Sequence, residues 1–379
     1  MDFASAPELG RLEELSAAWK EPASGRRARA LRLAAETLRP RFVAAPNVLA
    51  ARSFPLTTLL YPTKYAFGGA ALSLAPYVRL IHRALLVQFL QGGALKTLLF
   101  NPTDVMGALA TPFFRRMVET YGETLSLEIL TERFDPLETQ LTALGLGPAD
   151  IDYVAFDHFH TQDLRTLLGT TDGAYLSRFP RAKLLAPRVE WEAWDELHPL
   201  QKAWFVADGR KNVRTDKVVL TENDLVLGDG LWLLRTPGHT VGNQTLFWRT
   251  DSGVWGTSEN ATSADAYSPL DSTVPGVAQT ARQQDLEVIP NGNTPEAYGD
   301  QYASMIVEKT LVDRVQGAPA FPQMLPSSEV IPSRLAPLVR PRLVHGNHAS
   351  GSLVVPPRPA PPSRGTSGST SHRGLPVIP

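Results

Sequence analysis

The sequence predicts a layered α/β protein, and three observations lead to this fold class. Short apolar runs of strand length form two groups, one in the first half of the chain and one beyond residue 230. The order of strands, helices, then strands, helix and strand is typical of sheets covered by helices. The composition, with 43% hydrophobic and 20% charged residues, is that of a globular protein long enough for one large core.

The expected elements begin with two helices over residues 1–45, separated by the breaker sequence KEPASG. Residues 54–76 are too rich in Pro and Gly for a long regular element. The runs RALLVQFLQGG and LKTLLFNPTD predict a hairpin of buried strands joined by Gly-Gly. Two helices follow, with Thr111 and Asp135 as N-caps, and DIDYVAF is a strand that leads directly to His158.

In the second half, AKLLAP is a predicted strand and RVEWEAWDEL a predicted helix. GLWLLRTPGHT, NQTLFWRT and GVWGTSEN form a second strand-rich block. Residues 294–315 form a long helix, and PRLVHGNH is a last strand that ends in histidines. From residue 355 the chain consists mainly of Pro, Ser and Gly without acidic residues, which predicts a disordered tail.

Charge and composition exclude several classes of function. The net charge is −1, from 37 basic and 38 acidic residues, so no global field attracts nucleic acid or an anionic membrane. The chain has no cysteine, so any metal must bind to His, Asp or Glu. The N-terminus lacks the pattern of a signal peptide, and no stretch approaches the ~18 apolar residues of a membrane span. The expected location is therefore cytoplasmic.

Five of the eight histidines fall at predicted strand ends or in the loop just after one: His158, His160, His239, His345 and His348. Residues i and i+2 of an extended chain point to the same side, so His158 and His160 can reach one ion. Two solvated histidines are the plainer alternative for a single His-x-His pair. Loops at strand ends converge on one edge of a layered fold, however, and the whole set therefore predicts a metal site there.

Three segments together resemble the metallo-β-lactamase-fold hydrolases, and the nearest likeness is to the lactonase-like branch. They are LTALGLGPADIDYVAFDHFHTQD, FPRAKLLAPRVEWEAW and LGDGLWLLRTPGHTVGNQTLFW. The resemblance covers roughly residues 80–350 and implies a four-layer αββα sandwich. We expect this domain over residues 61–354, with residues 1–60 as an N-terminal helical extension and 355–379 as the tail. It also implies that a metal-activated water hydrolyses an ester, lactone or related acyl bond of a small, partly apolar substrate.

The first metal motif of that family, His-x-His-x-Asp-His, is HFHTQD here, from His158 to Asp163. The resemblance assigns a first metal to His158, His160 and His239. Gln162 and Asp163 replace the two ligands of a second metal. Glutamine is neutral and cannot act as a general base, whereas Asp163 could either take over as a ligand or cap the following helix. The expected cofactor is one zinc ion; a second ion is conceivable, and iron or manganese would also suit these ligands.

Two further ligands follow from the resemblance. The bridging Asp of the family aligns best with Glu259, with Asp265 as the fallback, although Glu259 could equally be a solvated loop carboxylate or a helix N-cap. The last His is expected at His348 rather than His345, because His348 follows a Gly-Asn turn. A second ion would then bind Asp163, Glu259 and His348, and either carboxylate could orient the water or accept its proton.

The tryptophans and two other function classes complete the expectations. Trp191 and Trp194 are spaced i, i+3 on one predicted helix face, with Trp204 and Phe205 beyond them. Core packing is the plainer interpretation, and an apolar wall beside the metal, shaped for an acyl chain or ring, is the alternative. The chain could also be a non-catalytic member that binds a ligand or partner. A mononuclear iron oxidoreductase is the third class, because two His and one carboxylate suit Fe(II).

Overall fold

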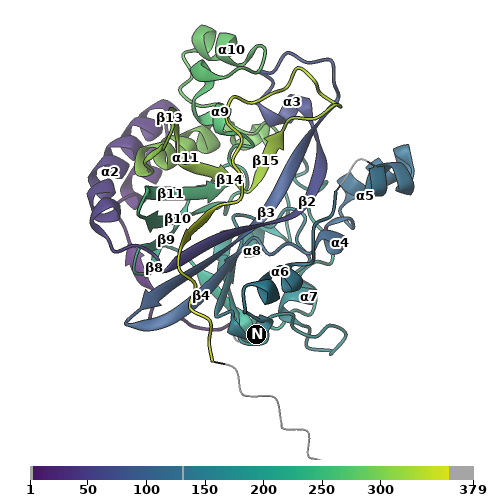
Figure 1. The fold of residues 1–379 in the computed structure, drawn as a ribbon. Coiled ribbons are helices and arrows are strands. Elements are labelled where there is room, and N and C mark those ends of the chain that lie inside the picture. Colours follow the sequence, from purple (N-terminus) through teal and green to yellow (C-terminus); the bar gives the residue numbers. More distant parts are fainter. Residues whose placement is uncertain (1–2, 130–131, 358–379) are drawn as a thin grey trace, which may run out of the picture.

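The fold is that of a computed structural model, which describes residues 3–129 and 132–357, except for the side chains of 127–129. Two sheets dominate these residues (Figure 1). The larger sheet has the order β16-β2-β3-β4-β5-β6-β7, and β15 pairs with β3 outside this path. Its strands are β2 (Ala50–Pro62), β3 (Tyr77–Gln91), β4 (Ala94–Phe100), β5 (Tyr153–Ala155), β6 (Lys183–Pro187), β7 (Val218–Thr221), β15 (Ser328–Ile331) and β16 (Ala349–Gly351).

The smaller sheet has the order β1-β8-β9-β10-β11-β14. Its strands are β1 (Gly10–Leu12), β8 (Asp224–Gly228), β9 (Leu231–Arg235), β10 (Gln244–Thr250), β11 (Gly253–Ser258) and β14 (Met324–Pro326). A separate two-stranded ribbon consists of β12 (Arg314–Val315) and β13 (Ala318–Pro322).

The α-helices cover the sheets and connect them. They are α1 (Ser16–Trp19), α2 (Ser24–Ala44), α3 (Thr63–Ala66), α4 (Val105–Ala108), α5 (Pro112–Tyr121), α6 (Leu137–Ala143), α7 (Leu164–Leu168), α8 (Arg188–Ala193), α9 (Ala264–Tyr267), α10 (Val277–Gln284) and α11 (Tyr298–Leu311). Shorter turns are the π-helical η1 (Thr124–Ile129) and the 3-10 turns η2 (Pro148–Asp150), η3 (Thr215–Lys217), η4 (Pro269–Asp271) and η5 (Pro295–Ala297). No helix among the described residues is long and apolar enough to cross a membrane.

Alternating side chains of the strands divide the core into layers. In β4, Leu98 and Phe100 lie in the core between the two sheets, where they meet Leu246 and Trp248 of β10. Leu99 points the other way, into the core beneath α6, α7 and α8. The outer face of the smaller sheet packs against α2 and α11. The order of layers is therefore α, β, β, α, and the four-layer sandwich expected from the sequence is confirmed.

The N-terminal region does not form a separate helical extension. β1 pairs with β8 in the smaller sheet, and α2 covers the outer face of that sheet. The expected boundary at residue 60 falls inside β2, which pairs with β3 along almost its whole length. These residues supply a strand and a covering helix to the sandwich, because they carry apolar faces that match its exposed sheet surface. Most of the expected tail, residues 358–379, lies outside the described residues.

Several expected elements are confirmed and three are wrong. The hairpin of β3 and β4, the cap at Thr111 and the long helix α11 all form. Residues 54–76 contain most of β2, because a bulge next to Pro55 accommodates the proline within the strand. Asp135 does not cap α6, whose N-cap is Pro136. Residues 341–348 form no strand, and the last strand is β16.

Candidate metal centre

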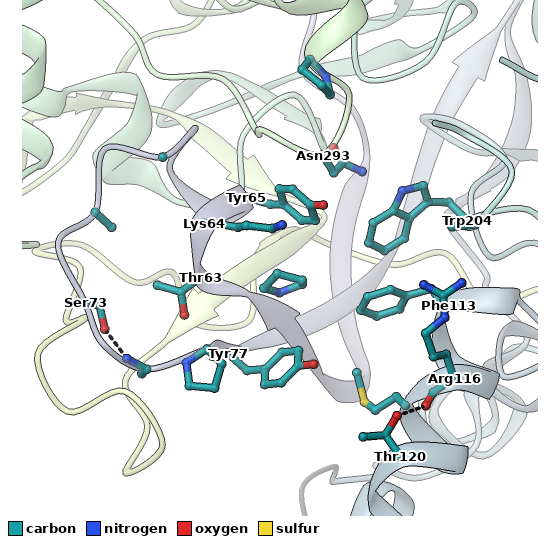
Figure 2. Close-up of a pocket in the computed structure, with 18 of the residues that line it drawn as sticks. Thr63, Lys64, Tyr65, Ser73, Tyr77, Phe113, Arg116, Thr120, Trp204 and Asn293 are labelled. Carbon is teal, nitrogen blue, oxygen red and sulfur yellow. Dashed lines mark hydrogen bonds between the residues drawn. The ribbon is translucent and has the colours of Figure 1, made fainter. Parts of the chain in front are cut away.

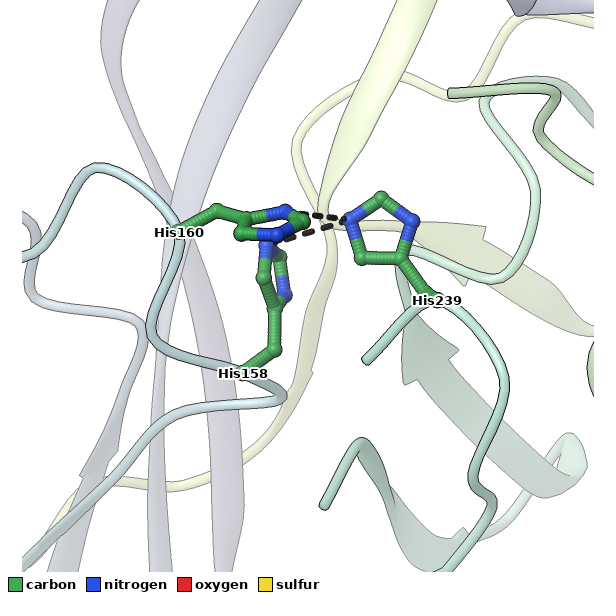
Figure 3. A group of neighbouring side chains, drawn as sticks. All are labelled: His158, His160 and His239. Atoms are coloured by element: carbon green, nitrogen blue, oxygen red, sulfur yellow. Dashed lines mark hydrogen bonds between the residues drawn. The ribbon is translucent and has the colours of Figure 1, made fainter. Parts of the chain in front are cut away.

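Three histidine rings converge at one edge of the two sheets (Figure 3). His158 and His160 follow β5, and His239 lies in the turn between β9 and β10. The Nε2 atom of His239 lies 3.2 Å from Nε2 of His158 and 3.2 Å from Nδ1 of His160. All three side chains are buried, with exposed fractions of 6%, 4% and 1%. The structure thus brings together the three histidines that the sequence predicts as ligands of a first metal.

Hydrogen bonds on the far side of two of the rings decide which nitrogen of each faces the centre. Nδ1 of His158 lies 2.7 Å from Oδ1 of Asp157 and donates to it, so Nε2 faces inward. Nε2 of His160 donates to Oε1 of Gln201. The amide of Gln201 is itself oriented, because its Nε2 donates to Oε1 of Glu296 at 2.7 Å. Carboxylate and amide partners of this kind fix the tautomer of metal-binding histidines.

The arrangement of the three rings suits a positively charged ion at the centre. Three ring nitrogens lie within 4.8 Å of one another. In neutral imidazoles, the tautomers above leave a lone pair toward the centre on His158 and on His160, and His239 presents a third when its hydrogen is on Nδ1. Burial lowers the pKa of His158, but the negative charge of Asp157 outweighs this and leaves its pKa raised. Burial, and then the neighbouring His158, hold the pKa values of His160 and His239 well below their ordinary value. The donor set fits a divalent ion that prefers nitrogen ligands, such as Zn²⁺.

A buried glutamate that the sequence analysis missed joins the two histidine loops. Glu190 of α8 is 1% exposed. Its Oε1 accepts from the backbone N–H of Phe159 at 3.0 Å, and its Oε2 accepts from that of Gly242 at 2.9 Å. A Cβ atom on Gly242 would lie 2.3 Å from Cβ of Glu190, so only glycine allows this approach. One carboxylate thereby sets the separation of the two loops that carry the ligands.

The turn that carries His239 packs directly against the backbone of α11. Gly238 has φ of +140°, and a Cβ atom there would lie 2.2 Å from the backbone of Gln301 in α11. The N–H of His239 donates to Oδ1 of Asn260, and Nδ2 of Asn260 donates to Glu308 at 2.8 Å. Glycine at position 238 is thus required both by its dihedral angle and by the close helix. The PGH sequence is the local signal of this turn.

Asp157 and Glu259 form a second group with His158, and the sequence analysis had not selected Asp157. Asn101 and Ser327 both donate to Oδ2 of Asp157, which leaves Oδ1 to His158. Burial alone would raise the pKa of Asp157, but His158 and these hydrogen bonds keep it below its ordinary value. Glu259 is partly buried, and desolvation of its carboxyl group raises its pKa to about 7. Its carboxylate lies within the group that contains His158, beside the three-histidine centre.

A chain of hydrogen bonds occupies the region next to Glu259. Nε2 of Gln162 donates to Oγ1 of Thr103 at 3.0 Å, and Oγ of Ser328 donates to Oε2 of Glu259 at 2.9 Å. His82 joins them, with Nε2 2.9 Å from Thr103 and Nδ1 2.9 Å from Ser328. Because the only hydrogen of Ser328 goes to the carboxylate, Nδ1 of His82 must donate to Ser328 and Nε2 must accept from Thr103. Every link has one direction, from Gln162 to Glu259.

Two expected ligands do not reach the centre. Asp163 caps α7 by accepting from the N–H of Arg165 at 3.1 Å, and its two oxygens also accept from the Arg165 guanidinium. His348 accepts from the indole N–H of Trp248 at 3.2 Å and packs against Trp255. The fallback Asp265 accepts from backbone N–H groups of the segment at Arg342. These corrections share one cause: each side chain is already held by other partners in the fold. For Asp163 the structure selects helix capping, the second of the two roles expected from the sequence.

The predicted aromatic wall is divided between two roles. Trp191 and Trp194 lie in the core beneath α8, as the plainer interpretation had it. Trp204 instead faces the centre, with its ring centroid 6.1 Å from that of His160. Its other face stacks on Phe113 of α5 at 4.4 Å. One of these tryptophans thus forms an apolar wall beside the histidines.

No family model matches the chain. Among curated proteins, it is similar to N-acyl homoserine lactonase AttM of Rhizobium radiobacter, with 34% identity over 120 residues, which are 29% of this chain and 40% of that protein. The protein of the same name from Rhizobium johnstonii is 31% identical over 123 residues, 30% of this chain and 41% of its own length. The chain thus spans about 40% of the length of these relatives. The resemblance to lactonases is confirmed over that segment.

Solved structures show a weaker likeness. A probable metal-dependent hydrolase from Staphylococcus aureus has 15% identity and a TM-score of 0.47, covering 68% of this chain and 83% of that one. A Bacillus thuringiensis AiiA mutant with N-decanoyl-L-homoserine bound has 17% identity and a TM-score of 0.43, covering 63% and 88%. Both scores lie below 0.5, so the layered architecture rests on the sheets and helices described above.

Proposed function

We propose that this chain is a metal-dependent hydrolase that cleaves an ester or lactone bond with a single metal ion. The observation that carries the proposal is the convergence of one ring nitrogen from each of His158, His160 and His239, with hydrogen-bond acceptors behind two of the rings. Three nitrogen ligands leave a fourth position for water, which is the geometry of a catalytic zinc site. A divalent ion there supplies Lewis acidity and makes water acidic enough to attack near neutral pH.

Other residues of the chain orient the ligands, accept a proton and shield the centre. Asp157 and Gln201 hold the rings of His158 and His160 in the tautomers that ligation needs. Glu259 shares the group with His158 and is oriented by Ser328, so it is the carboxylate placed to take a proton from the attacking water. Trp204 shields the centre from solvent on one side. Together these residues support hydrolysis of an acyl bond rather than simple ligand storage.

Metal content and turnover on freshly purified, untagged protein test the proposal. We expect close to one zinc ion per chain and hydrolysis of 4-nitrophenyl butyrate or N-hexanoyl homoserine lactone. Chelation should abolish the activity, and zinc should restore it. A protein that takes up zinc but hydrolyses neither substrate would be the binding module instead. Oxygen consumption by the iron-loaded protein would favour the oxidoreductase, and two tightly bound ions would contradict the single-ion site.

A further inference from the structure

Two cavities that differ greatly in size share part of their lining close to the candidate centre. The inner cavity reaches the three histidines and has a volume of about 90 Å³. The outer cavity, which lies between β2, α3 and α5, has a volume of about 720 Å³ (Figure 2). Ligand sites for small molecules generally measure about 300–1,000 Å³. The inner cavity can therefore hold the bond that reacts, and the bulk of a substrate must lie in the outer one.

Four residues line both cavities: Phe113, Met117, Trp204 and Asn293. The stacked rings of Phe113 and Trp204 form the apolar part of this shared wall. Asn293 is 6% exposed, and its Oδ1 atom has no hydrogen-bond partner among the described residues. A buried, unpartnered polar atom at the junction is a site for a hydrogen-bond donor on a bound molecule. The two cavities are thus adjoining parts of one binding region.

The outer cavity carries two cations and no carboxylate. Lys64 and Arg116 line it from opposite sides, and none of its lining residues is Asp or Glu (Figure 2). Nζ of Lys64 lies 4.8 Å from the centroid of the Tyr65 ring, which also lines the cavity. Within the described part of the chain, neither cation has an ion-pair partner. Arginines elsewhere in the chain that are ion-paired, such as Arg165 with Asp163 and Arg178 with Glu138, are by contrast already neutralised. Unpaired cations above aromatic rings attract an anion with an apolar body.

We infer that the substrate of the proposed hydrolase carries a negatively charged group, which Lys64 and Arg116 bind in the outer cavity while the ester or lactone bond reaches the histidines. This inference rests on the proposed function for the position of the reacting bond. The class is an acyl ester or lactone whose aliphatic or aromatic body ends in a carboxylate, sulfate or phosphate. The apolar body contacts Phe113 and Trp204, and a hydroxyl or amide N–H carried on that body donates to Oδ1 of Asn293.

A pair of matched dyes tests the binding part without any turnover. 1-Anilinonaphthalene-8-sulfonate and N-phenyl-1-naphthylamine share their rings, and only the first has a charge. Fluorescence titration of the metal-stripped full chain should show tighter binding of the sulfonate. In the double variant Lys64→Gln with Arg116→Gln, the ratio of the two affinities should fall about tenfold, because exposed charge pairs contribute a fewfold each. The matched control, Arg115→Gln with Lys202→Gln, removes the same charges from exposed positions that do not line the cavity and should leave the ratio unchanged.

Displacement and turnover then separate the possible outcomes. Hexanoate, hexyl sulfate or hexyl phosphate should displace the sulfonate dye better than hexan-1-ol, and their order identifies the anion. The zinc-loaded protein should prefer the mono-4-nitrophenyl ester of adipate to 4-nitrophenyl hexanoate, and the double variant should lose that preference. An equal loss of both dyes in the double variant, or equal displacement by hexan-1-ol, would overturn the inference. Absence of hydrolysis with the dye result intact would overturn only the proposed function.

Discussion

The candidate site has two neighbouring halves, and they differ in how their polar groups are paired. In the histidine half, one ring nitrogen from each of three residues points at a common centre, and among the described residues these nitrogens have only one another as partners. In the half around Glu259, each donor has an acceptor and the chain runs in one direction from Gln162 to the carboxylate. The difference teaches that metal binding depends on lone pairs left without partners, and that the presence of His, Asp or Glu is not sufficient.

We call the half around Glu259, in which each donor has an acceptor, the closed half, and the histidine half the open half. The closed half has a structural role that the open half lacks. A buried polar network that is fully satisfied is stabilising and specifies one arrangement of its members. His82 belongs to β3 and Ser328 to β15, and the two residues are direct register partners in the antiparallel pair. The network is therefore a product of strand pairing, and it keeps Glu259 facing the histidines. Breaking each half in turn should give different losses.

The largest effect is expected in the open half. His239→Ala removes one of three ligands, so most of the bound metal and nearly all hydrolytic activity should disappear, with the fold retained because the ligand lies at the edge of the sheets. Inductively coupled plasma mass spectrometry and far-UV circular dichroism measure both. The matched control is His348→Ala, which removes an imidazole held by Trp248 and Trp255 and should keep the metal. Full metal content in the His239 variant would place the site elsewhere.

The next effect concerns the stability of the closed half at low pH. Burial, followed by the positive charges of His158 and Arg83, lowers the pKa of His82 to about 4 against the opposing charge of Asp157. Between about pH 4 and 6.5 the unfolded chain binds a proton that the folded chain does not, so stability falls as the pH is lowered through this window. A shift of this size corresponds to at most about 3 kcal/mol. Urea unfolding of metal-stripped His82→Gln should therefore show a weaker pH dependence than the parent chain. Parallel curves would mean that His82 is protonated in the fold.

The open half could be predicted from the sequence because its signals are local. His158 and His160 are two residues apart after an apolar strand, and the PGH turn places His239. The layered α/β class was equally accessible, because the order of strands and helices is typical of sheets covered by helices, and the four-layer arrangement followed from the resemblance to the metallo-β-lactamase fold. Even the bulge that carries Pro55 through β2 changes only the length of an element. Short-range patterns therefore sufficed for the fold class and for the three histidines of one half of the site.

The closed half was not accessible because it depends on long-range register. His82 has no neighbour in the sequence that would indicate its role, and strand pairing brings it to a residue 246 positions away. In the sequence, Glu190 is only one of several acidic residues of the predicted helix RVEWEAWDEL. Asp163 had two equally plausible roles, and the neighbouring Arg165 decided between them. Whether the lone pair of a side chain remains free is decided only when the strands and loops come together at this edge of the two sheets.

A smaller effect tests whether the closed half serves the open one. Ser328→Ala removes the donor to Glu259 and leaves Nδ1 of His82 without an acceptor. We expect kcat to fall about tenfold, in line with one lost orienting hydrogen bond, while the metal content stays unchanged. Ser328→Thr keeps the hydroxyl and should recover most of the rate. Ser333→Ala, at a loop position, controls for serine removal in general. A loss of metal equal to the loss of rate would make Ser328 a support of the centre as a whole.

The smallest effect concerns Asp163, which the sequence allowed as a ligand and the structure places as a helix cap. Asp163→Ala removes the acceptor for the N–H of Arg165 and the partner of its guanidinium, so the free energy of unfolding should fall by about 1 kcal/mol. Asp163→Asn retains a capping oxygen and should recover most of that loss. Neither variant should change the metal content, because no group of described residues that could hold an ion includes Asp163. Chemical denaturation and metal analysis of the two variants test these two expectations. A parallel loss of metal in both would return Asp163 to the centre and require a rearranged α7, since its carboxylate cannot cap the helix and reach His158 at once.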